Sequence, residues 1–210
     1  MQTLYNEIIG LPRTYPGLAA LRPQVVYLVG CRQFNQFCCT WRALVDPDTF
    51  CPFCPTELER RERTPLRVCA GWMVLENEFP RPDVEKMLLI VPKRHLLSAA
   101  DLTDEDGMNI VYLWTVCMRE LDCAGGAFIG RFGDPRVHAG TVPHIHANVI
   151  VPRRESGMSV PLAKLVDGEY GHREDYARLR QFASILDGRG VEWLFSEEGV
   201  RETQPAIART

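Results

Sequence analysis

His144-Ile145-His146-Ala147-Asn148 has the clearest strand pattern in this 210-residue chain. Alternate side chains of a β-strand point to the same face, so the two histidines and the asparagine are expected to share one surface. The intervening residues and the valines that follow form an apolar opposite face, which is typical of a strand that covers a core with one side. The pattern predicts a strand over residues 144–151 with exposed imidazoles on its polar face. An isolated H-x-H is also typical of half-buried histidines that bond backbone carbonyls.

The composition is that of an ordinary globular protein. Hydrophobic residues make up 46% of the chain and charged residues 24%, and this length favours one domain with additions. The net charge of -3 argues against a general electrostatic binder of nucleic-acid polymers. No apolar run approaches the ~20 residues of a membrane helix, and no signal-peptide pattern opens the chain. We therefore expect a cytoplasmic protein without membrane or nucleic-acid partners.

The strand patterns predict an antiparallel sheet. Residues 67–76 and 87–92 are rich in large apolar residues, and the turn-forming Phe-Pro-Arg-Pro-Asp between them indicates a hairpin. Residues 127–132 and 144–151 predict two further strands that are antiparallel neighbours. Strands before and after a helix favour the α+β class, with helices flanking the sheet.

The helix and the outer segments are predicted from caps and periodicity. Thr103 followed by Asp106 resembles a capping box, which opens a helix that continues to about Asp122. A second amphipathic helix is expected over residues 172–186, and the polar chain from about Glu197 is expected to be ragged. The domain organisation that we expect is an N-terminal extension at 1–50 with a short strand at 25–29, a core at 51–153, and a C-terminal helical extension with a tail at 154–210.

Cys51-Pro52-Phe53-Cys54 forms a C-x-x-C knuckle whose spacing allows two thiolates to bind one tetrahedral ion. A redox pair is the alternative interpretation. Zinc would need two further ligands. Five histidines are available, and the adjacent Cys38 and Cys39 are a competing source, although adjacent cysteines chelate one ion poorly.

Four motifs follow one another along the chain. They are C-x-x-C at 51–54, Glu-Asn-Glu-Phe-Pro at 76–80, Pro-Lys-Arg-His at 92–95 and Gly-Thr-Val-Pro-His-Ile-His at 140–146. This succession resembles the histidine triad (HIT) superfamily. It looks closest to the branch that includes galactose-1-phosphate uridylyltransferase and dinucleoside polyphosphate phosphorylases. The resemblance covers roughly residues 50–153 and implies a HIT-like antiparallel sheet and a homodimer.

The resemblance also implies roles for the histidines and cysteines. The middle histidine of the family motif, His146 here, is the nucleophile that attacks the α-phosphorus of a nucleotide and forms a covalent nucleotidyl-histidine. The family zinc is structural, and the matching ligands are Cys51, Cys54, His95 and His144. If a backbone carbonyl accepts the Nδ1 proton of the nucleophile, Nε2 is free to attack.

The remaining site residues each carry an alternative interpretation. The family places a phosphate-contacting hydroxyl at Thr141, which could instead cap a turn. The third triad position is Asn148 rather than His or Gln, and an amide cannot act as a general acid. The candidate nucleotide-binding residues are Asn77, Phe79, Arg131 and Gly140. Arg131 is a departure from the family, which commonly has an asparagine at this position. Among the candidates, Asn77 could be a simple turn residue, and Arg131 could clamp a phosphate or be a solvated strand residue.

The expected function is that of an enzyme which transfers or hydrolyses a nucleotidyl group of a nucleotide conjugate through His146. The acceptor could be water, inorganic phosphate or a sugar phosphate. The alternative is a nucleotide-binding, zinc-stabilised interaction protein without turnover. The presence of His146 favours the enzyme, because decay of such a site would most simply remove the nucleophile.

Overall fold

The computed structural model describes residues 28, 31–45, 50–122, 125–132, 142–153 and 173–204. The chain divides into two compact units: residues 51–134 with 143–162, and residues 1–50 with 135–142 and 163–210. The domain boundaries expected from the sequence stay a prediction.

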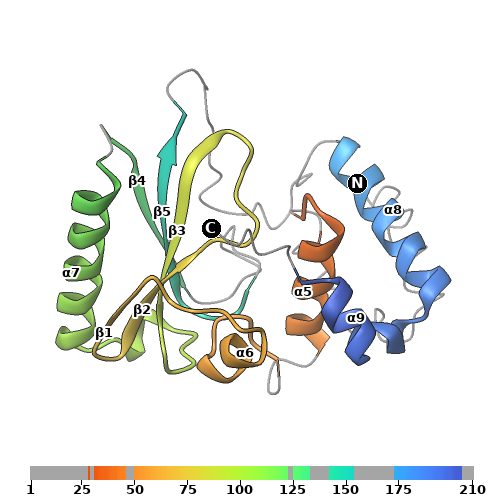
Figure 1. Cartoon of the computed structure of the whole chain (residues 1–210), viewed down its shortest axis with the longest axis horizontal. Helices are drawn as coiled ribbons and strands as arrows, with labels where there is room; N and C mark the ends of the chain where they lie inside the picture. The colour runs from red at the N-terminus through yellow and green to blue at the C-terminus, as the bar shows by residue number, and fades with distance from the viewer. Residues whose placement is uncertain are drawn as a thin grey trace. The chain divides into compact units, whose positions relative to one another are not determined.

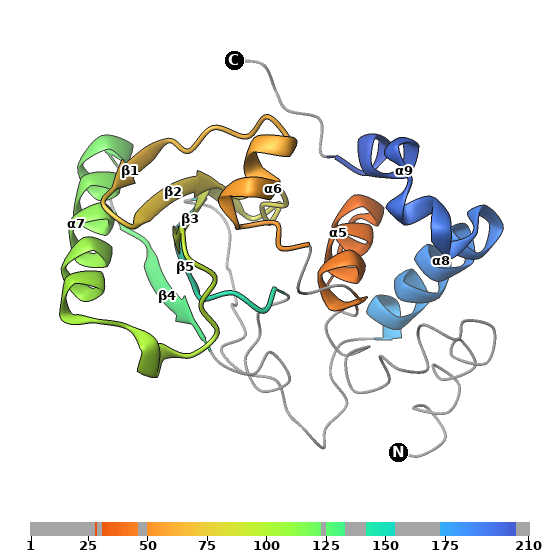
Figure 2. The same ribbon diagram turned by 90° about the horizontal axis from the view of Figure 1, so that it is seen from below.

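The unit that begins at Cys51 is built on a five-stranded antiparallel sheet in the order β1-β2-β3-β5-β4. Helix α7 lies against one face of this sheet and α6 on its other side (Figures 1 and 2). The predicted α+β class, an antiparallel sheet with flanking helices, is confirmed. The elements are α6 (Pro55–Arg60), β1 (Arg67–Cys69), β2 (Trp72–Glu76), β3 (Val84–Pro92), η2 (Ala99–Asp101), α7 (Asp104–Leu121), β4 (Ala127–Arg131) and β5 (His146–Pro152).

The segment 67–76, predicted as one strand, is a hairpin of two strands, so this prediction was wrong. Ala70 has a left-handed φ of 46°, which reverses the chain so that Cys69 pairs directly with Trp72. The predicted hairpin of β2 with β3 is confirmed, with Trp72 opposite Pro92. Alternating apolar periodicity could not reveal the turn, because the residues on both sides of it are strand formers.

Strand β5 begins at His146, two residues later than predicted, so His144 precedes the strand. The predicted antiparallel pairing with β4 is confirmed and places Arg131 opposite His146. On its other side β5 pairs with β3, where Leu89 lies opposite Asn148. Because directly opposite residues point to the same face, the site candidates of β4 and β5 share one face of the sheet.

Helix α7 begins with the predicted capping box. The Thr103 hydroxyl accepts from the Asp106 amide, and the Asp106 carboxylate accepts from the Thr103 amide. Asp122, with a left-handed φ of 44°, ends the helix. The face of the sheet toward α7 is apolar and forms one core with it. The buried residues of this core are Trp72, Val74, Leu88, Ile90, Leu113, Cys117, Ile145, Ala147 and Val149.

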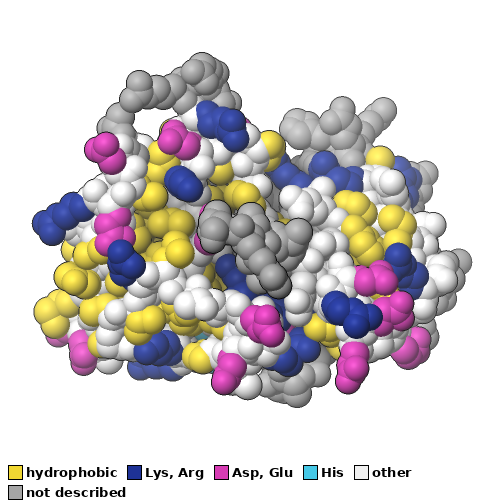
Figure 3. All heavy atoms as spheres, viewed as in Figure 1, with side chains coloured by type: hydrophobic (Ala, Val, Ile, Leu, Met, Phe, Trp, Pro, Cys, Tyr) yellow, Lys and Arg dark blue, Asp and Glu magenta, His cyan; other side chains and the backbone are white. Residues whose placement is uncertain are grey.

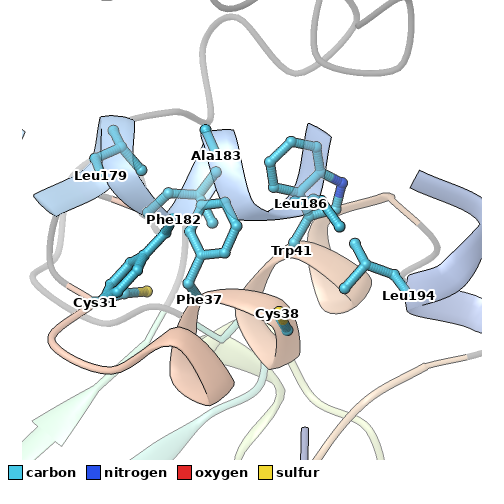
Figure 4. Close-up of a cluster of buried hydrophobic side chains, with 10 residues drawn as sticks. Cys31, Phe37, Cys38, Trp41, Leu179, Phe182, Ala183, Leu186 and Leu194 are labelled. Atoms are coloured by element: carbon cyan, nitrogen blue, oxygen red, sulfur yellow. The ribbon is translucent and has the colours of Figure 1, made fainter. Parts of the chain in front are cut away.

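The other unit contains α5 (Phe34–Val45), α8 (Arg173–Arg189), η3 (Val191–Phe195) and α9 (Glu197–Glu202). Side chains of α5 and α8, among them Phe37 and Phe182, point toward one another in a common core (Figure 4). The ragged tail expected from Glu197 was wrong for residues 197–204, and residues 205–210 lie outside the described residues. Ser196 caps the Gly199 amide at the start of α9, and the buried Arg42 side chain donates to the Gly199 carbonyl at 2.9 Å.

Three predictions fall outside the described residues. These are the phosphate contact by Thr141, the nucleotide contact by Gly140 and, apart from the buried Leu28, the strand expected at 25–29. Within the described part of the chain, no helix combines the length and the apolar character needed to cross a membrane.

Candidate metal centre and histidine site

The four ligands predicted for zinc lie together in the sheet unit. The donor atoms of Cys51, Cys54, His95 and His144 are all within 4.8 Å of one another. His144 Nδ1 is 3.2 Å from Cys51 Sγ and 3.7 Å from Cys54 Sγ, and His95 Nδ1 is 3.3 Å from Cys54 Sγ. Tetrahedral zinc with its usual bond lengths separates sulfur and nitrogen ligands by about 3.6 Å. The group could therefore hold a metal ion, and two cysteines with two histidines are a donor set that zinc fits.

The ring of His144 is oriented for a ligand role by its second nitrogen. Nε2 lies 3.1 Å from the carbonyl oxygen of Pro92, which can only accept a hydrogen bond, so Nε2 carries the proton. The lone pair is then on Nδ1, the atom that faces the thiols. A carbonyl behind a ligating imidazole is the usual second partner of such a residue.

The knuckle is a tight turn at the start of a helix. The Cys54 amide donates to the Cys51 carbonyl at 3.1 Å, and the Cys54 carbonyl accepts from Glu57 at the first turn of α6. The hydrogen bond from the Cys51 thiol lowers the pKa of Cys54 to about 4. The same shared proton, together with burial, raises the pKa of Cys51. One thiolate is therefore already favoured before a metal binds.

The loop that carries His95 is attached to the first turn of α7. The Arg94 side chain forms an ion pair with the Asp106 carboxylate, which also accepts from the buried Trp72 Nε1 at 2.7 Å. The Ile145 amide donates to the Leu96 carbonyl at 2.7 Å. These bonds hold the loop from both sides, so the position of His95 depends on the helix cap.

His146 has the backbone partner that the sequence-based chemistry required. Its Nδ1 lies 2.7 Å from the carbonyl oxygen of His144. Because a carbonyl only accepts, the neutral ring carries its proton on Nδ1 and its lone pair on Nε2. This is the tautomer in which Nε2 can act as a nucleophile.

The expectation that the His146 imidazole is exposed was wrong, because the residue is only 5% exposed. Phe53, from the middle of the knuckle, packs edge-on against it with ring centroids 5.2 Å apart and contacts His144 in the same way at 5.9 Å. His146 does not belong to the apolar core beneath α7. It lies on the opposite face of the sheet, where Phe53 connects it to the metal ligands.

Asn148 is buried with an unsatisfied donor. The residue is 3% exposed, and its Nδ2 has no hydrogen-bond partner among the described residues. Buried polar groups in folded proteins almost always have a partner, and an orphan of this kind requires an explanation. It lies two residues from His146 on the same face of β5, with Arg131 opposite His146 on β4.

The Glu76–Pro80 loop carries the two other described nucleotide-binding candidates. The Asn77 side-chain oxygen accepts from the Phe79 amide at 2.8 Å, which is the turn role that was its alternative interpretation. The Asn77 amide donates to the Met87 carbonyl at 2.9 Å. Both residues are half-buried, and their nucleotide contacts stay predictions.

Cys38 and Cys39, the competing metal ligands, do not join the metal group among the described residues. Cys38 is fully buried in the core of α5 and α8. Burial raises its pKa to about 12, so this thiol remains protonated and is a poor metal ligand.

Two contributors to the site were missed by the sequence analysis. Phe53 was visible only as a spacer between two cysteines, and Arg94 only as a residue beside His95. Neither has a recognisable pattern, because each acts through a partner that is distant in sequence, His146 for the first and Asp106 for the second.

The chain matches no protein-family model and no curated protein. Among solved structures it is similar to a zinc-bound histidine triad family protein from Mycobacterium smegmatis, at 20% identity over 67% of this chain and 97% of that one, with a TM-score of 0.43. A HIT family hydrolase from Legionella pneumophila matches at 21% identity over 49% and 96% of the two chains, with a TM-score of 0.39. A histidine triad protein from Clostridium difficile matches at 18% over 52% and 96%, with a TM-score of 0.40.

Proposed function

We propose that this protein is a HIT-type enzyme that transfers or hydrolyses the nucleotidyl group of a nucleotide conjugate through a covalent intermediate on His146. The observation that carries the proposal is the hydrogen bond between His146 Nδ1 and the His144 carbonyl. It selects the nucleophilic tautomer and aligns the ring on the same face as an orphan amide donor.

The reaction has two displacements. In the first, His146 Nε2 attacks the α-phosphorus, a P–N bond forms, and the P–O bond to the leaving group breaks. In the second, the acceptor attacks the same phosphorus, the P–N bond breaks, and the imidazole is regenerated. Splitting one displacement into two in this way is the general benefit of a covalent intermediate.

Asn148 and Arg131 would stabilise the charge on the phosphoryl oxygens. A fixed donor that is already desolvated contributes most where charge develops, because it needs no reorganisation during the reaction. Arg131, opposite His146, brings a cation to the same face. Neither residue can protonate the leaving group at neutral pH, so a phosphate or pyrophosphate leaving group of low pKa is favoured over an alcohol.

The zinc that the Cys51–Cys54 knuckle fits would be structural. All four tetrahedral positions are supplied by protein, which leaves no open position for substrate or water. Its ligands come from three separate segments, the knuckle, the loop at His95 and the entry to β5. The ion would therefore fix Phe53 and the start of β5 around His146.

We also propose that the protein is a homodimer that uses the outer face of α7. Met108, Val111 and Tyr112 are 67%, 56% and 57% exposed, and they lie three and four residues apart on one helical stripe. Hydrophobic side chains gather over the α7 part of the surface in Figure 3. Exposed apolar patches of this kind mark interaction sites, and a two-fold dimer is the commonest way to cover one.

The burial of His146 favours the alternative function, in which the protein binds a nucleotide without turning it over. The residue is 5% exposed, so little of its ring is open to a substrate unless neighbouring side chains move. The enzyme proposal therefore includes an opening step before chemistry, which the binding alternative does not need.

The test is a turnover screen with dinucleoside polyphosphates and nucleotide sugars, with release of nucleoside monophosphate as the readout. Wild type should turn over at least one substrate, and His146→Ala should lose that activity while remaining folded and retaining its metal content. Cys69→Ser, a half-buried cysteine outside the metal group, is the matched control. Binding of the substrates without any turnover by wild type would support the alternative.

A further inference from the structure

A buried ion pair lies beside the metal knuckle and has no part in the proposed chemistry. The side chains of Arg61 and Glu78 are 5% and 8% exposed. Arg61 Nη1 donates to both carboxylate oxygens of Glu78, at 2.8 and 3.0 Å. Buried charges are expensive to keep unless they are paired with an opposite charge and hydrogen-bonded.

The guanidinium of Arg61 also reaches the knuckle. Its Nη2 donates to the carbonyl oxygen of Pro52 at 2.8 Å, and Pro52 lies between the two cysteine ligands. Its Nε is 3.3 Å from the Glu57 carboxylate at the first turn of α6. The guanidinium of Arg61 therefore donates a hydrogen bond to the turn that presents the thiols and forms an ion pair with the helix that follows it.

On its other side the pair holds the Glu76–Pro80 loop. Glu78 belongs to this loop, and its carboxylate also forms an ion pair with Arg63, with Nη1 at 2.8 Å. Arg63 Nη2 donates to the Glu76 carbonyl at 2.6 Å. The loop that carries Asn77 and Phe79 is thus fixed through Glu78, and the common partner that it shares with the knuckle is Arg61.

We propose that Arg61 is a positioning residue that couples metal binding at Cys51 and Cys54 to nucleotide binding at the Glu76–Pro80 loop. The nucleotide part of this inference rests on the proposed function. The contacts of Arg61 that connect the knuckle to the loop do not depend on it. When the metal fixes the knuckle, the Pro52 carbonyl holds the guanidinium in one orientation. The guanidinium then holds the Glu78 carboxylate, and through it the Glu76–Pro80 loop, in the conformation that binds the nucleotide.

Coupling between two sites is reciprocal, so it can be measured from the metal side. If bound metal raises the affinity for the nucleotide by some factor, bound nucleotide must raise the affinity for the metal by the same factor. The experiment titrates zinc-loaded protein with a competing chelator, with and without a saturating mixture of the four common nucleoside monophosphates. Wild type should hold zinc about 10-fold more tightly when the nucleotides are present, a size that is typical of outer-shell effects on metal affinity.

Arg61→Lys keeps the positive charge but loses the planar guanidinium group with its several donors. Glu78→Gln keeps the shape of the side chain but loses its negative charge. Both variants should bind zinc and nucleotide with a coupling factor of less than about 2-fold. The matched control is Arg60→Gln, because Arg60 is the exposed neighbour that binds only the Glu57 carboxylate among the described residues. Its coupling factor should equal that of wild type. Full coupling in both Arg61→Lys and Glu78→Gln would overturn the proposal.

Hydrogen exchange of the zinc-loaded proteins provides a second measurement that does not need a nucleotide. The amides of Asn77 and Phe79 should exchange faster in Arg61→Lys and Glu78→Gln than in wild type and Arg60→Gln. Unchanged exchange in both variants would refute the connection itself. Faster exchange together with no nucleotide binding by wild type would instead refute the proposed function and leave the connection standing.

Discussion

The Nδ1 atom of His146 lies 2.7 Å from the carbonyl oxygen of His144, and the Nδ1 atom of His144 lies 3.2 Å from the thiol of Cys51. One short segment therefore contributes a ligand to the metal group and, through its backbone, sets the tautomer of the candidate nucleophile. Any change that moves His144 would alter both. Metal binding and catalysis are expected to be coupled for this reason.

Replacement of Asn148 by Leu separates function from stability. Leucine has nearly the shape of asparagine but has no polar group, so it removes the buried donor that lacks a partner. Removing an unsatisfied polar group is close to neutral or stabilising, so the melting temperature should stay the same or rise. Loss of one preorganised donor should lower kcat about 100-fold. Thermal melts and steady-state kinetics measure the two effects. A stable variant with wild-type kcat would refute the proposed role of Asn148.

Loss of a metal ligand should reduce both zinc content and stability. Wild type should contain about one zinc per chain, and Cys51→Ser and His95→Ala should contain much less. Their melting temperatures should fall, because binding energy at a structural site is also folding energy. Elemental analysis and calorimetry measure the two effects. Cys38→Ser is the informative comparison and should keep its zinc. If Cys51→Ser retained full zinc and Cys38→Ser lost it, the metal site would be in the other unit and not at the knuckle.

The stability contribution of Asp106 should depend on pH. Burial alone would raise the pKa of this carboxyl, but hydrogen bonds from Thr103 and Trp72 and the charge of Arg94 hold the pKa below its usual range. A carboxyl with a lowered pKa stabilises the folded state above its unfolded pKa of about 4 and loses that contribution as the pH falls toward the folded value. Asp106→Asn should therefore unfold at lower urea than wild type at pH 7, and the gap should shrink from about pH 5 to pH 3. A gap that stays constant or widens on acidification would contradict this assignment.

The outer face of α7 should determine the oligomeric state. Tyr112→Glu places a charge in the middle of the apolar stripe and should convert a dimer into a monomer in sedimentation experiments. Leu97→Lys changes an exposed apolar residue outside α7 and should leave the dimer intact. A wild-type chain that remains monomeric at all concentrations would remove the proposed interface, and so would a dimer that survives the Tyr112 substitution.

The sequence predicted the parts of the fold that depend on local pattern. The capping box at Thr103, the pairing of β4 with β5 and the hairpin of β2 with β3 were all readable, because hydrophobic periodicity and cap chemistry act over a few residues. The hairpin turn at Ala70 was not, since it depends on one left-handed alanine, and the single glycine that follows did not by itself mark a turn. Helix α9 was missed because its sequence is polar. It is stabilised by a cap at Ser196 and by a hydrogen bond from Arg42, which is distant in sequence.

For the candidate site, the family resemblance implied the four metal ligands that the structure brings together, whereas the residue types alone left several candidates open. The burial of His146 could not be predicted, because it depends on residues that are remote in sequence, such as Phe53. That the Asn148 side-chain amide would be buried without a hydrogen-bond partner among the described residues could not be predicted either. A strand pattern specifies which side chains share a face, whereas it does not specify what covers that face.

The most direct test of the central claim is to trap the covalent intermediate. Protein mixed briefly with an active nucleotide conjugate, quenched in alkali and analysed by mass spectrometry should carry one nucleotidyl group, and peptide mapping should place it on His146. The adduct should be labile in acid, as expected for a P–N bond, and absent from His146→Ala. Turnover by His146→Ala at the wild-type rate, or an adduct on a different residue, would contradict the account.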